Sequence, residues 1–366
     1  MRGIADKYVI DRHKIMFHPE RLASWLKARD NWAEAKKVYP IYVEFSSSGL
    51  CNHRCKFCAL DYLGYNSGLA DFENLKRAIG DMAKGGVKSI QFGGEGEPLL
   101  HPKIKEIVRH TKSLGIDVSF TTNGTLLKEG LLRDILPLVT WIKVSLDAGL
   151  AATHMKIHRP KIQDFDAIMD NLKKAVEIRR VTKAKCTLGG QMLLLPDNHK
   201  EAVILAKKLK EIGLDYLVIK PYSQHKKSIT REYENISYKK YFYLAKELKK
   251  LNSGKFQVIF RENTMEKLEA GRDYETCHAV PFFWAYLMAN GDVYTCSSFL
   301  GDGEFKLGNY NKESFKEIWE GAKRKKHWKF IRTKFDINQC RKNCRMDEAN
   351  GYLERLINPP EHVNFI

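Results

Sequence analysis

Three cysteines close together in the chain are the residues with the clearest chemical potential. Cys51, Cys55 and Cys58 lie in the segment CNHRCKFC, directly after the apolar stretch 41–45. Three thiolates at the spacing C-x₃-C-x₂-C can ligate three irons of a [4Fe–4S] cluster and leave the fourth iron open to a small molecule. A zinc site is the alternative, although zinc usually takes four protein ligands, and a disulfide framework fits an odd trio poorly. The spacing therefore indicates an iron–sulfur cluster that takes part in chemistry.

Three further motifs follow these cysteines along the chain. They are QFGGEGEPLLHP at residues 91–102, FTTNGTLL at residues 120–127 and IKVSLDAG at residues 142–149. Together with the aromatic Phe57 before the third cysteine, their order resembles that of the radical S-adenosylmethionine (radical SAM) superfamily. The resemblance implies that the cysteine trio holds a [4Fe–4S] cluster at which SAM binds and is cleaved.

The resemblance also implies which residues surround SAM. The amino and carboxylate groups of its methionine would bind the open iron, and an aromatic side chain would lie against the adenine. The glycines of GGEGEP would let the backbone approach the methionine, and a glutamate would accept from its ammonium group. The cofactor-binding residues expected on this basis are Phe57, Gly94, Glu95, Gly96, Glu97, Thr122, Asn123, Ser145, Asp147 and Gln191.

Short β-rich runs alternate with helical patterns between about residues 41 and 222, and each motif falls where a run ends. Six such repeats imply a parallel sheet with right-handed crossovers, and the ends of its strands form the catalytic face. Six repeats instead of eight predict an incomplete barrel. The expected fold is α/β: a partial (β/α)₆ TIM-like barrel with a small C-terminal β-hairpin/helix iron–sulfur domain. The expected strands are residues 41–45, 89–93, 117–121, 141–146, 186–195 and 216–221.

A second group of four cysteines follows the predicted barrel: Cys277, Cys296, Cys340 and Cys344. The segment NGDVYTC (290–296) contains Asn-Gly, a strong turn signal, and it resembles part of the SPASM/Twitch extension of radical SAM enzymes. Four cysteines match the shorter Twitch form, which implies one auxiliary [4Fe–4S] cluster, fully ligated by protein and acting as an electron conduit. A four-cysteine zinc site is the alternative. Cys186, inside an apolar run, is interpreted as a buried small hydrophobe.

These assignments divide the chain into five expected parts. They are an N-terminal extension (1–40), the radical SAM partial barrel (41–225), a bridging segment (226–275), the auxiliary-cluster domain (276–350) and a C-terminal tail (351–366).

Composition agrees with an enzyme of this kind. With 366 residues and 43% hydrophobic content, the chain can build a sizeable core. It has no apolar run that could span a bilayer and no signal peptide, so we expect the eight cysteines to lie in a reducing, cytoplasmic compartment.

The net charge of +18 comes largely from lysines spread along the chain. It indicates either solvated helix faces or attraction to a phosphorylated or nucleotide-linked substrate, or to a flavodoxin or ferredoxin electron donor. Neither a nucleic-acid partner nor a membrane is expected.

The implied activity is reductive cleavage of SAM to a 5′-deoxyadenosyl radical, which abstracts hydrogen from a substrate. An auxiliary cluster that can take one electron suits oxidation of an alcohol, so we expect dehydrogenation of a carbohydrate, cyclitol or nucleotide-sugar. A peptide or protein maturase and a carbohydrate epimerase are the alternatives. Only forty residues precede the first strand, which leaves little room for a peptide-recognition domain and favours a small molecule. A non-catalytic iron–sulfur or zinc protein would have no use for the SAM motifs.

Oxidation of an alcohol also requires a proton acceptor. The candidates lie near strand ends or beside a cluster cysteine: Arg159, Lys220, Tyr222 and His278. Each could instead be a substrate contact or a structural residue, and the sequence favours none of them.

Overall fold

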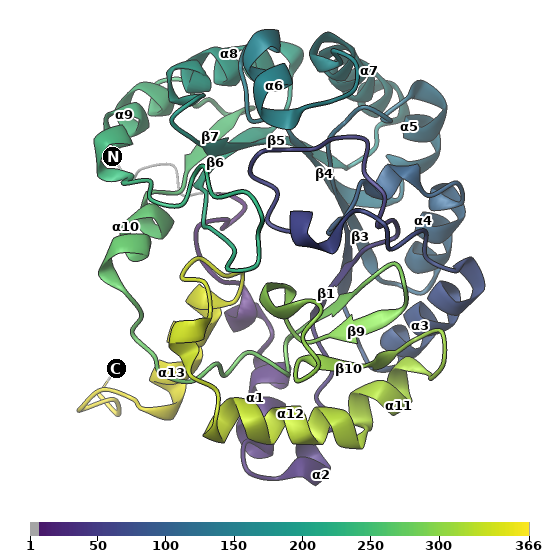
Figure 1. Cartoon of the computed structure of the whole chain (residues 1–366), viewed down its shortest axis with the longest axis vertical. Coiled ribbons are helices and arrows are strands. Elements are labelled where there is room, and N and C mark those ends of the chain that lie inside the picture. The colour runs from purple at the N-terminus through teal and green to yellow at the C-terminus, as the bar shows by residue number, and fades with distance from the viewer. Residues whose placement is uncertain (1–6, 366) are drawn as a thin grey trace.

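The computed structural model describes residues 7–365, in which ten strands form one continuous sheet. Strands β1 to β7 follow one another in parallel order, and β8 pairs in parallel with the other side of β1. Because β10 and β7 are the two edges, the sheet curves without closing, as the sequence predicts for a partial barrel (Figure 1). The strands are β1 Tyr42–Phe45, β2 Ser89–Phe92, β3 Asp117–Thr122, β4 Val139–Ser145, β5 Thr187–Leu194, β6 Tyr216–Pro221, β7 Gln257–Phe260, β8 Trp284–Leu287, β9 Asp292–Tyr294 and β10 Lys306–Asn309.

The six predicted strands are all present, and β7 and β8 extend the parallel sheet beyond them. Helices α3 to α10 surround the outer face of the barrel, while the remaining helices gather at the auxiliary-domain end (Figure 1). The helices are α1 Pro19–Ala28, α2 Trp32–Ala35, α3 Phe72–Lys84, α4 Ile104–Ser113, α5 Glu129–Ile135, α6 Ala151–His158, α7 Phe165–Thr182, α8 Ala202–Ile212, α9 Tyr243–Lys249, α10 Glu262–Ala270, α11 Phe315–Glu320, α12 Ala322–Thr333 and α13 Asp347–Ile357.

The domain boundaries remain a prediction. Helix α13 runs across the expected boundary at residue 350, and β8 and β9 join the barrel sheet directly. Residues 1–6 of the expected N-terminal extension and residue 366 of the expected tail lie outside the described residues. No helix in the described part of the chain has both the length and the apolar character needed to cross a membrane.

Alternation along the strands divides their side chains between two environments. Ile142 and Val144 of β4 are buried in the main core between sheet and helices. Leu217 and Ile219 of β6 belong to the same core. The intervening side chains of each strand therefore face the concave interior of the barrel, which we call the lumen.

The lower end of the lumen, where the strands begin, is filled by apolar side chains. Tyr216, Val218 and Ile259 form a buried cluster there, and Tyr8 and Ile10 pack against it from the N-terminal segment. A Cβ atom at Gly189 would lie 2.2 Å from Cζ of Tyr216, so this strand position has to be glycine for the tyrosine to fit. This cluster covers the lumen beside the beginnings of β6 and β7, and the sequence motifs lie at the other end, where the strands finish.

Arg324 of α12 joins the C-terminal helices to the N-terminal segment. Its side chain is fully buried and donates to the carbonyl oxygens of Trp319 (2.8 Å), Val38 (3.0 Å) and Ala35 (3.2 Å), and to that of Pro281 (3.1 Å). Burial lowers the pKa of this guanidinium to about 9. The network compensates a buried charge with several carbonyl dipoles.

We expect Arg324→Met to lower the free energy of unfolding by about 2–4 kcal/mol, because several buried carbonyls lose their donor together. The matched control is Arg332→Met on the same helix, whose guanidinium pairs with the exposed Asp30 and should contribute less than about 1 kcal/mol. Denaturant unfolding followed by circular dichroism measures both. Equal losses in the two variants would show that the buried network does not hold these segments together.

Candidate functional site

The cysteine trio lies in the loop that leaves β1, and all three thiols are unpaired. The loop turns tightly, since the Cys58 amide donates to the Cys55 carbonyl (3.1 Å). Burial, followed by the charges of Cys58 and Cys51, raises the pKa of Cys55. These mutual effects indicate that the three thiols lie near one another. Iron ligation would displace their protons and stabilise the thiolate forms that burial disfavours. The donor set therefore fits a three-cysteine [4Fe–4S] site.

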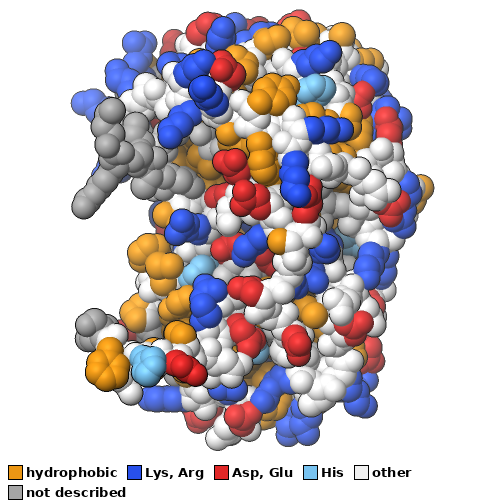
Figure 2. Space-filling view, turned by 90° about the vertical axis from the view of Figure 1, so that its left-hand side faces the viewer, with side chains coloured by type: hydrophobic (Ala, Val, Ile, Leu, Met, Phe, Trp, Pro, Cys, Tyr) orange, Lys and Arg blue, Asp and Glu red, His pale blue; other side chains and the backbone are white. Residues whose placement is uncertain are grey.

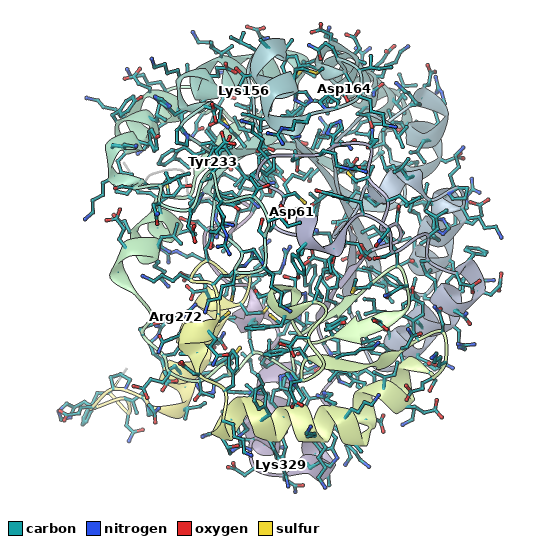
Figure 3. All side chains as sticks on the ribbon, viewed as in Figure 1. Asp61, Lys156, Asp164, Tyr233, Arg272 and Lys329 are labelled. Atoms are coloured by element: carbon teal, nitrogen blue, oxygen red, sulfur yellow. The ribbon has the colours of Figure 1, made fainter. Side chains whose placement is uncertain are left out.

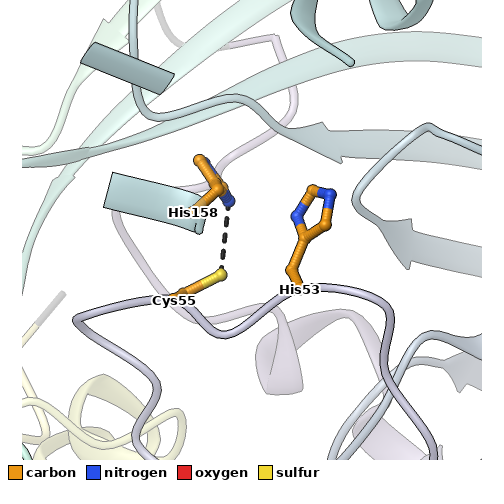
Figure 4. Close-up of side chains that lie close together, drawn as sticks. All are labelled: His53, Cys55 and His158. Atoms are coloured by element: carbon orange, nitrogen blue, oxygen red, sulfur yellow. Dashed lines mark hydrogen bonds between the residues drawn. The ribbon is translucent and has the colours of Figure 1, made fainter. Parts of the chain in front are cut away.

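Helix α6 holds this loop from above. The amides of Arg54 and Lys56 donate to the carbonyls of His158 (3.0 Å) and Ile157 (2.9 Å). The Sγ atom of Cys55 lies 3.3 Å from Nδ1 of His158, and His53 lies beside them (Figure 4). The central ligand of the trio is thus positioned by both backbone and side chain of one helix end.

A buried group of histidines and aspartates supports the loop, and the sequence analysis missed it. Asp164 bridges Nε2 of His53 (2.8 Å) and Nε2 of His154 (3.1 Å). Nε2 of His158 lies 2.9 Å from the Leu146 carbonyl. Burial lowers the pKa of His53, and it lowers that of His154 to about 4. The available signal was the spacing of His154 and His158, four residues apart on one helix.

The ligand atoms of His53, Cys55 and His158 lie within 4.8 Å of one another, as do those of His53, His154 and Asp164. Such groups can bind a metal ion. Here both nitrogens of His154 and of His158 are hydrogen-bonded, and Nε2 of His53 is bonded to Asp164, whereas the buried Nδ1 of His53 has no hydrogen-bond partner among the described residues. This hydrogen bonding favours a role in positioning the cysteine loop.

The loop after β6 folds over the cysteine loop. Asp61, three residues beyond Cys58, accepts from the amides of Ile229 (2.9 Å) and Thr230 (3.0 Å). The hydroxyl of Ser228 donates to the Cys58 carbonyl (3.2 Å). Figure 3 shows Asp61 near the middle of the molecule, between the barrel and the auxiliary segment. These hydrogen bonds hold the loop after β6 against the cysteine loop, next to the predicted cluster site.

Glu97 connects the GGEGEP turn to the end of β3. Its buried carboxylate accepts from the Thr122 hydroxyl (2.6 Å) and from the amides of Asn123 (2.8 Å) and Leu99 (3.1 Å). Asn123 in turn donates to Asn52 in the cysteine loop (2.7 Å). Burial raises the pKa of Glu97 to about 7. Three of the expected SAM contacts are thus brought together beside the trio.

Glu95, two residues earlier, faces another direction. Its two carboxylate oxygens accept from the amide of Ala289 (2.8 Å) and the hydroxyl of Ser67 (2.8 Å). Close packing also explains the neighbouring glycines: a Cβ at Gly94 would lie 2.2 Å from Oη of Tyr286, and one at Gly96 would lie 2.3 Å from the Leu50 carbonyl oxygen. Glu95 is therefore bonded to the auxiliary hairpin, whereas Glu97 is bonded to the end of β3 beside the trio. This location makes Glu97 the one of the two that we test for SAM binding.

The remaining expected SAM contacts lie near the same strand ends. Gln191 donates to Ser145 across β5 and β4 (3.4 Å). Phe57 makes an edge contact with the His158 ring, 5.4 Å between centroids. Asp147 is fully buried, and its carboxylate accepts from the Leu193 amide (2.5 Å) and lies 3.3 Å from His158. Its hydrogen bonds hold the strand ends and the histidine, so a direct SAM contact by Asp147 is the least supported of these assignments.

The second cysteine group also converges, although its members are far apart in the sequence. Burial and the charge of Cys340 raise the pKa of Cys277 to about 11 and that of Cys296 to about 12. The neighbouring Cys344 thiol lowers the pKa of Cys340 to about 7. The Cys296 thiol accepts from the Ser298 amide (3.3 Å). By donor type, these four unpaired thiols suit either a fully protein-ligated [4Fe–4S] cluster or four-cysteine zinc.

Neighbouring groups hold this second site in place. Asn350 of α13 donates to the Cys277 thiol (3.4 Å). Arg272, labelled in Figure 3, donates to the carbonyls of Ile337 (3.2 Å) and Cys340 (3.0 Å). Cys186 is remote from both groups and buried in the main core, as predicted.

Of the four candidate proton acceptors, one faces the lumen. Lys220 is half-buried there on β6. Arg159 is exposed at the end of α6, and His278 binds Glu354 (2.6 Å). The hydroxyl of Tyr222 donates to Gln224 (3.0 Å), and burial raises its pKa to about 12. Lys220 is the best placed of the four for a substrate.

Known families match the two parts of this architecture. Residues 45–205 match the radical SAM superfamily, and residues 277–345 match the iron-sulfur cluster-binding domain SPASM. The fold and the two cysteine groups define an enzyme with a SAM-binding cluster and an auxiliary iron–sulfur domain. The chain belongs to the radical SAM superfamily and carries a SPASM-type domain. Its cofactors are SAM and [4Fe–4S] clusters. That the cysteine trio and the second cysteine group hold the clusters stays a prediction.

Individual relatives are more distant. The chain is 29% identical over 182 residues to the tungsten-containing aldehyde ferredoxin oxidoreductase cofactor-modifying protein of Pyrococcus furiosus, covering 49% of this chain and 50% of that one. It is 28% identical over 193 residues to GTP 3′,8-cyclase of Chlorobaculum tepidum, covering 50% and 55%. The chain thus spans about half the length of the curated relatives it matches.

The fold is shared with a solved structure. Streptococcus suis SuiB bound to the precursor peptide SuiA superposes with a TM-score of 0.62 at 17% identity, covering 91% of this chain and 77% of that one. This likeness supports the fold alone.

The two cysteine groups should bind metal independently. We expect the anaerobically reconstituted protein to hold about eight irons, and the variant with Cys51, Cys55 and Cys58 all changed to Ala to keep about four. The variant with the second group changed to Ala should also keep about four. Iron and zinc analysis measures both, with Cys186→Ala as the control that keeps the full content. Zinc in the second group would contradict the auxiliary [4Fe–4S] cluster.

Glu97→Gln should weaken SAM binding at least tenfold, or about 1.4 kcal/mol, because the ammonium group loses a charged acceptor. Since burial raises the pKa of Glu97 to about 7, the carboxylate becomes neutral below that pH, and SAM binding by the wild type should weaken as the pH falls. Calorimetric titration with SAM measures both effects. The matched control is Glu95→Gln, which should change the affinity less than about twofold because its oxygens face Ala289 and Ser67. Equal losses in the two variants would contradict this assignment.

Proposed function

We propose that this enzyme uses SAM to oxidise an alcohol of a small molecule, a carbohydrate, cyclitol or nucleotide-sugar, bound in the barrel lumen. Bound together, the cluster and SAM supply a 5′-deoxyadenosyl radical that abstracts a hydrogen atom from the substrate. Loss of one further proton and one electron then converts the alcohol carbon to a ketone. The auxiliary cluster is the proposed acceptor of that electron.

One observation carries the proposal: residues adjoining both cysteine groups reach the same lumen. Arg345 follows Cys344 directly, and its guanidinium pairs with Glu44 of β1 (3.2 Å) and lies over the ring of Tyr42 (5.1 Å). On the other side, Asp147 follows β4 and its carboxylate lies 3.3 Å from Nε2 of His158, whose Nδ1 lies 3.3 Å from Sγ of Cys55. A substrate in the lumen would therefore lie between the two clusters.

The polar character of the lumen supports a small polar substrate. Hydrogen-bonding side chains face it from β1, β2, β4 and β5, including Tyr42, whose hydroxyl donates to Gln91 (2.9 Å). The apolar plug at the lower end keeps this space shallow and excludes bulk water from below. Two curated relatives are named for GTP and for a cofactor, which also supports a small molecule.

The reducing electron would come from a flavodoxin or ferredoxin. The net charge of +18 supports an acidic protein donor. Figure 2 shows the basic side chains of one face interspersed with acidic ones, so no single docking surface stands out there.

A peptide-modifying role is the second candidate. SuiB, which shares the fold, was solved with a precursor peptide. The two roles differ in where the substrate lies: a peptide would pass through the mouth of the lumen, and a small molecule would lie within it. Epimerisation differs from oxidation in returning a hydrogen atom to the substrate, which needs no electron acceptor.

Anaerobic protein supplied with SAM and dithionite should release 5′-deoxyadenosine and methionine, measured by liquid chromatography and mass spectrometry. The variant without the cysteine trio should release neither. The variant without the second cysteine group should still cleave SAM, because its trio is intact, but should lose ketone formation.

Candidate alcohols deuterated at the carbinol carbon identify the reaction further. Deuterium in 5′-deoxyadenosine together with a ketone product supports oxidation, whereas an inverted alcohol supports epimerisation. Absence of 5′-deoxyadenosine from protein with its full iron content would overturn the proposed function.

A further inference from the structure

The hydrogen bonds that position the cysteine loop leave one buried histidine nitrogen unused. Nε2 of His53 is bonded to the Asp164 carboxylate (2.8 Å), and the residue is only 1% exposed. Its Nδ1 is buried as well and has no hydrogen-bond partner within residues 7–365. A buried polar atom without a partner costs free energy, and a bound ion is one arrangement that removes this cost.

The unused nitrogen lies beside a thiol and a second imidazole. Figure 4 shows a ring nitrogen of His53 on the side that faces Cys55 and His158. One ligand atom from each of these three residues lies within 4.8 Å of the other two. Sγ of Cys55 is 3.3 Å from Nδ1 of His158. A tetrahedral metal ion with ordinary bond lengths holds a sulfur and a nitrogen ligand about 3.6 Å apart, so this pair is already close to ligand spacing.

The outer hydrogen bonds determine which nitrogen of each ring is available. Nε2 of His53 faces the Asp164 carboxylate, and Nε2 of His158 faces the Leu146 carbonyl oxygen (2.9 Å). An ionised carboxylate and a carbonyl can only accept, so both Nε2 atoms are donors and both Nδ1 atoms carry a lone pair. Metal-ligating histidines have this arrangement, in which the outer nitrogen donates and thereby orients the ring. The thiol of Cys55 donates to Nδ1 of His158, and a metal ion would replace that proton.

A neighbouring set of possible ligands is already hydrogen-bonded. His53, His154 and Asp164 also lie within 4.8 Å of one another. The two oxygens of Asp164 bond Nε2 of His53 (2.8 Å) and Nε2 of His154 (3.1 Å), and Nδ1 of His154 lies 3.2 Å from the Leu146 carbonyl oxygen. Both oxygens of Asp164 and both nitrogens of His154 are thus engaged. This set orients His53 and leaves its Nδ1 for the ion.

We propose that His53, Cys55 and His158 bind one Fe²⁺ ion in the cluster-free protein, and that this ion is the first iron to reach the cysteine trio. Imidazole and thiolate ligands suit Fe²⁺, and the site shares Cys55 with the predicted cluster. On binding, the thiol releases its proton to solvent and the iron stays in its ferrous state. The inference does not depend on the identity of the substrate.

The site is tested by counting bound cobalt in a full-length chain with Cys51→Ala and Cys58→Ala. This variant cannot hold a cluster at the trio, but it keeps Cys55 and the second cysteine group. Co²⁺ serves as the probe for Fe²⁺ because it resists oxidation and its thiolate complexes absorb light. After anaerobic dialysis against Co²⁺, metal analysis should find about one ion more in this variant than in the same chain with His53→Gln added.

The matched control is His154→Gln, the same substitution in the adjacent ring. It should keep the additional ion, because His154 supplies no ligand atom to the proposed site. Cys55→Ala should lose the ion together with its thiolate-to-cobalt absorption, and circular dichroism shows whether each variant is folded. Retention of the ion by His53→Gln or by Cys55→Ala would overturn the site. Its loss in His154→Gln together with its retention in Cys55→Ala would place the ion at Asp164 and would also overturn it.

The role in assembly is measured on the chain with all its cysteines, so it is tested even if the double cysteine variant does not fold. Cluster-free protein is mixed anaerobically with sulfide and limiting Fe²⁺, and cluster formation is followed by absorption. His53→Gln should slow this formation about tenfold, in proportion to its loss of metal affinity, and should reach the wild-type iron content when iron is in excess. His154→Gln should form the cluster at the wild-type rate. An equal or faster rate in His53→Gln would overturn the assembly role.

Discussion

The parallel pairing of β8 with β1 is the interaction on which the rest of the site depends. Tyr42 to Phe45 lie opposite Trp284 to Leu287, residue for residue. Strand β1 leads into the cysteine trio. Strand β8 follows Cys277 in the sequence and leads through a hairpin to Cys296. The pairing of β1 with β8 thus fixes the positions of both cysteine groups relative to the lumen. A slip of one residue would turn Glu44 away from the lumen and break its pair with Arg345.

The GGEGEP turn adds a second link between the two ends of the site. Glu97 binds the end of β3 beside the trio, whereas Glu95 binds the backbone of the β8–β9 hairpin. Their carboxylates diverge because Gly94 and Gly96 allow the turn to pack against Tyr286 and the Leu50 carbonyl with no side chain between. The turn that carries the SAM motif therefore also holds the auxiliary hairpin in register with the barrel.

Much of this architecture could be predicted from sequence because its signals are local. The predicted barrel strands are apolar runs that lead into polar motifs, and the cysteine spacings predict the two metal groups. Strands β7 and β8 were missed because QVIF and WAYL are short runs in a region without β-α periodicity. The histidine group was missed for another reason: His53, His154 and Asp164 come from three separate segments, and only the folded chain brings them together.

The lysines that face the lumen, Lys143 of β4 and Lys220 of β6, also could not be assigned from the sequence. Strand alternation suggests that Lys143 faces away from Ile142 and Val144, but lysine on a strand is usually a solvent-facing residue. Only barrel curvature turns that face inward, and only the folded chain brings Arg345 to Glu44 and Arg261 to Asp11. The charge balance of the lumen is thus a property of the tertiary structure, because the partner of each of these carboxylates lies far away in the sequence.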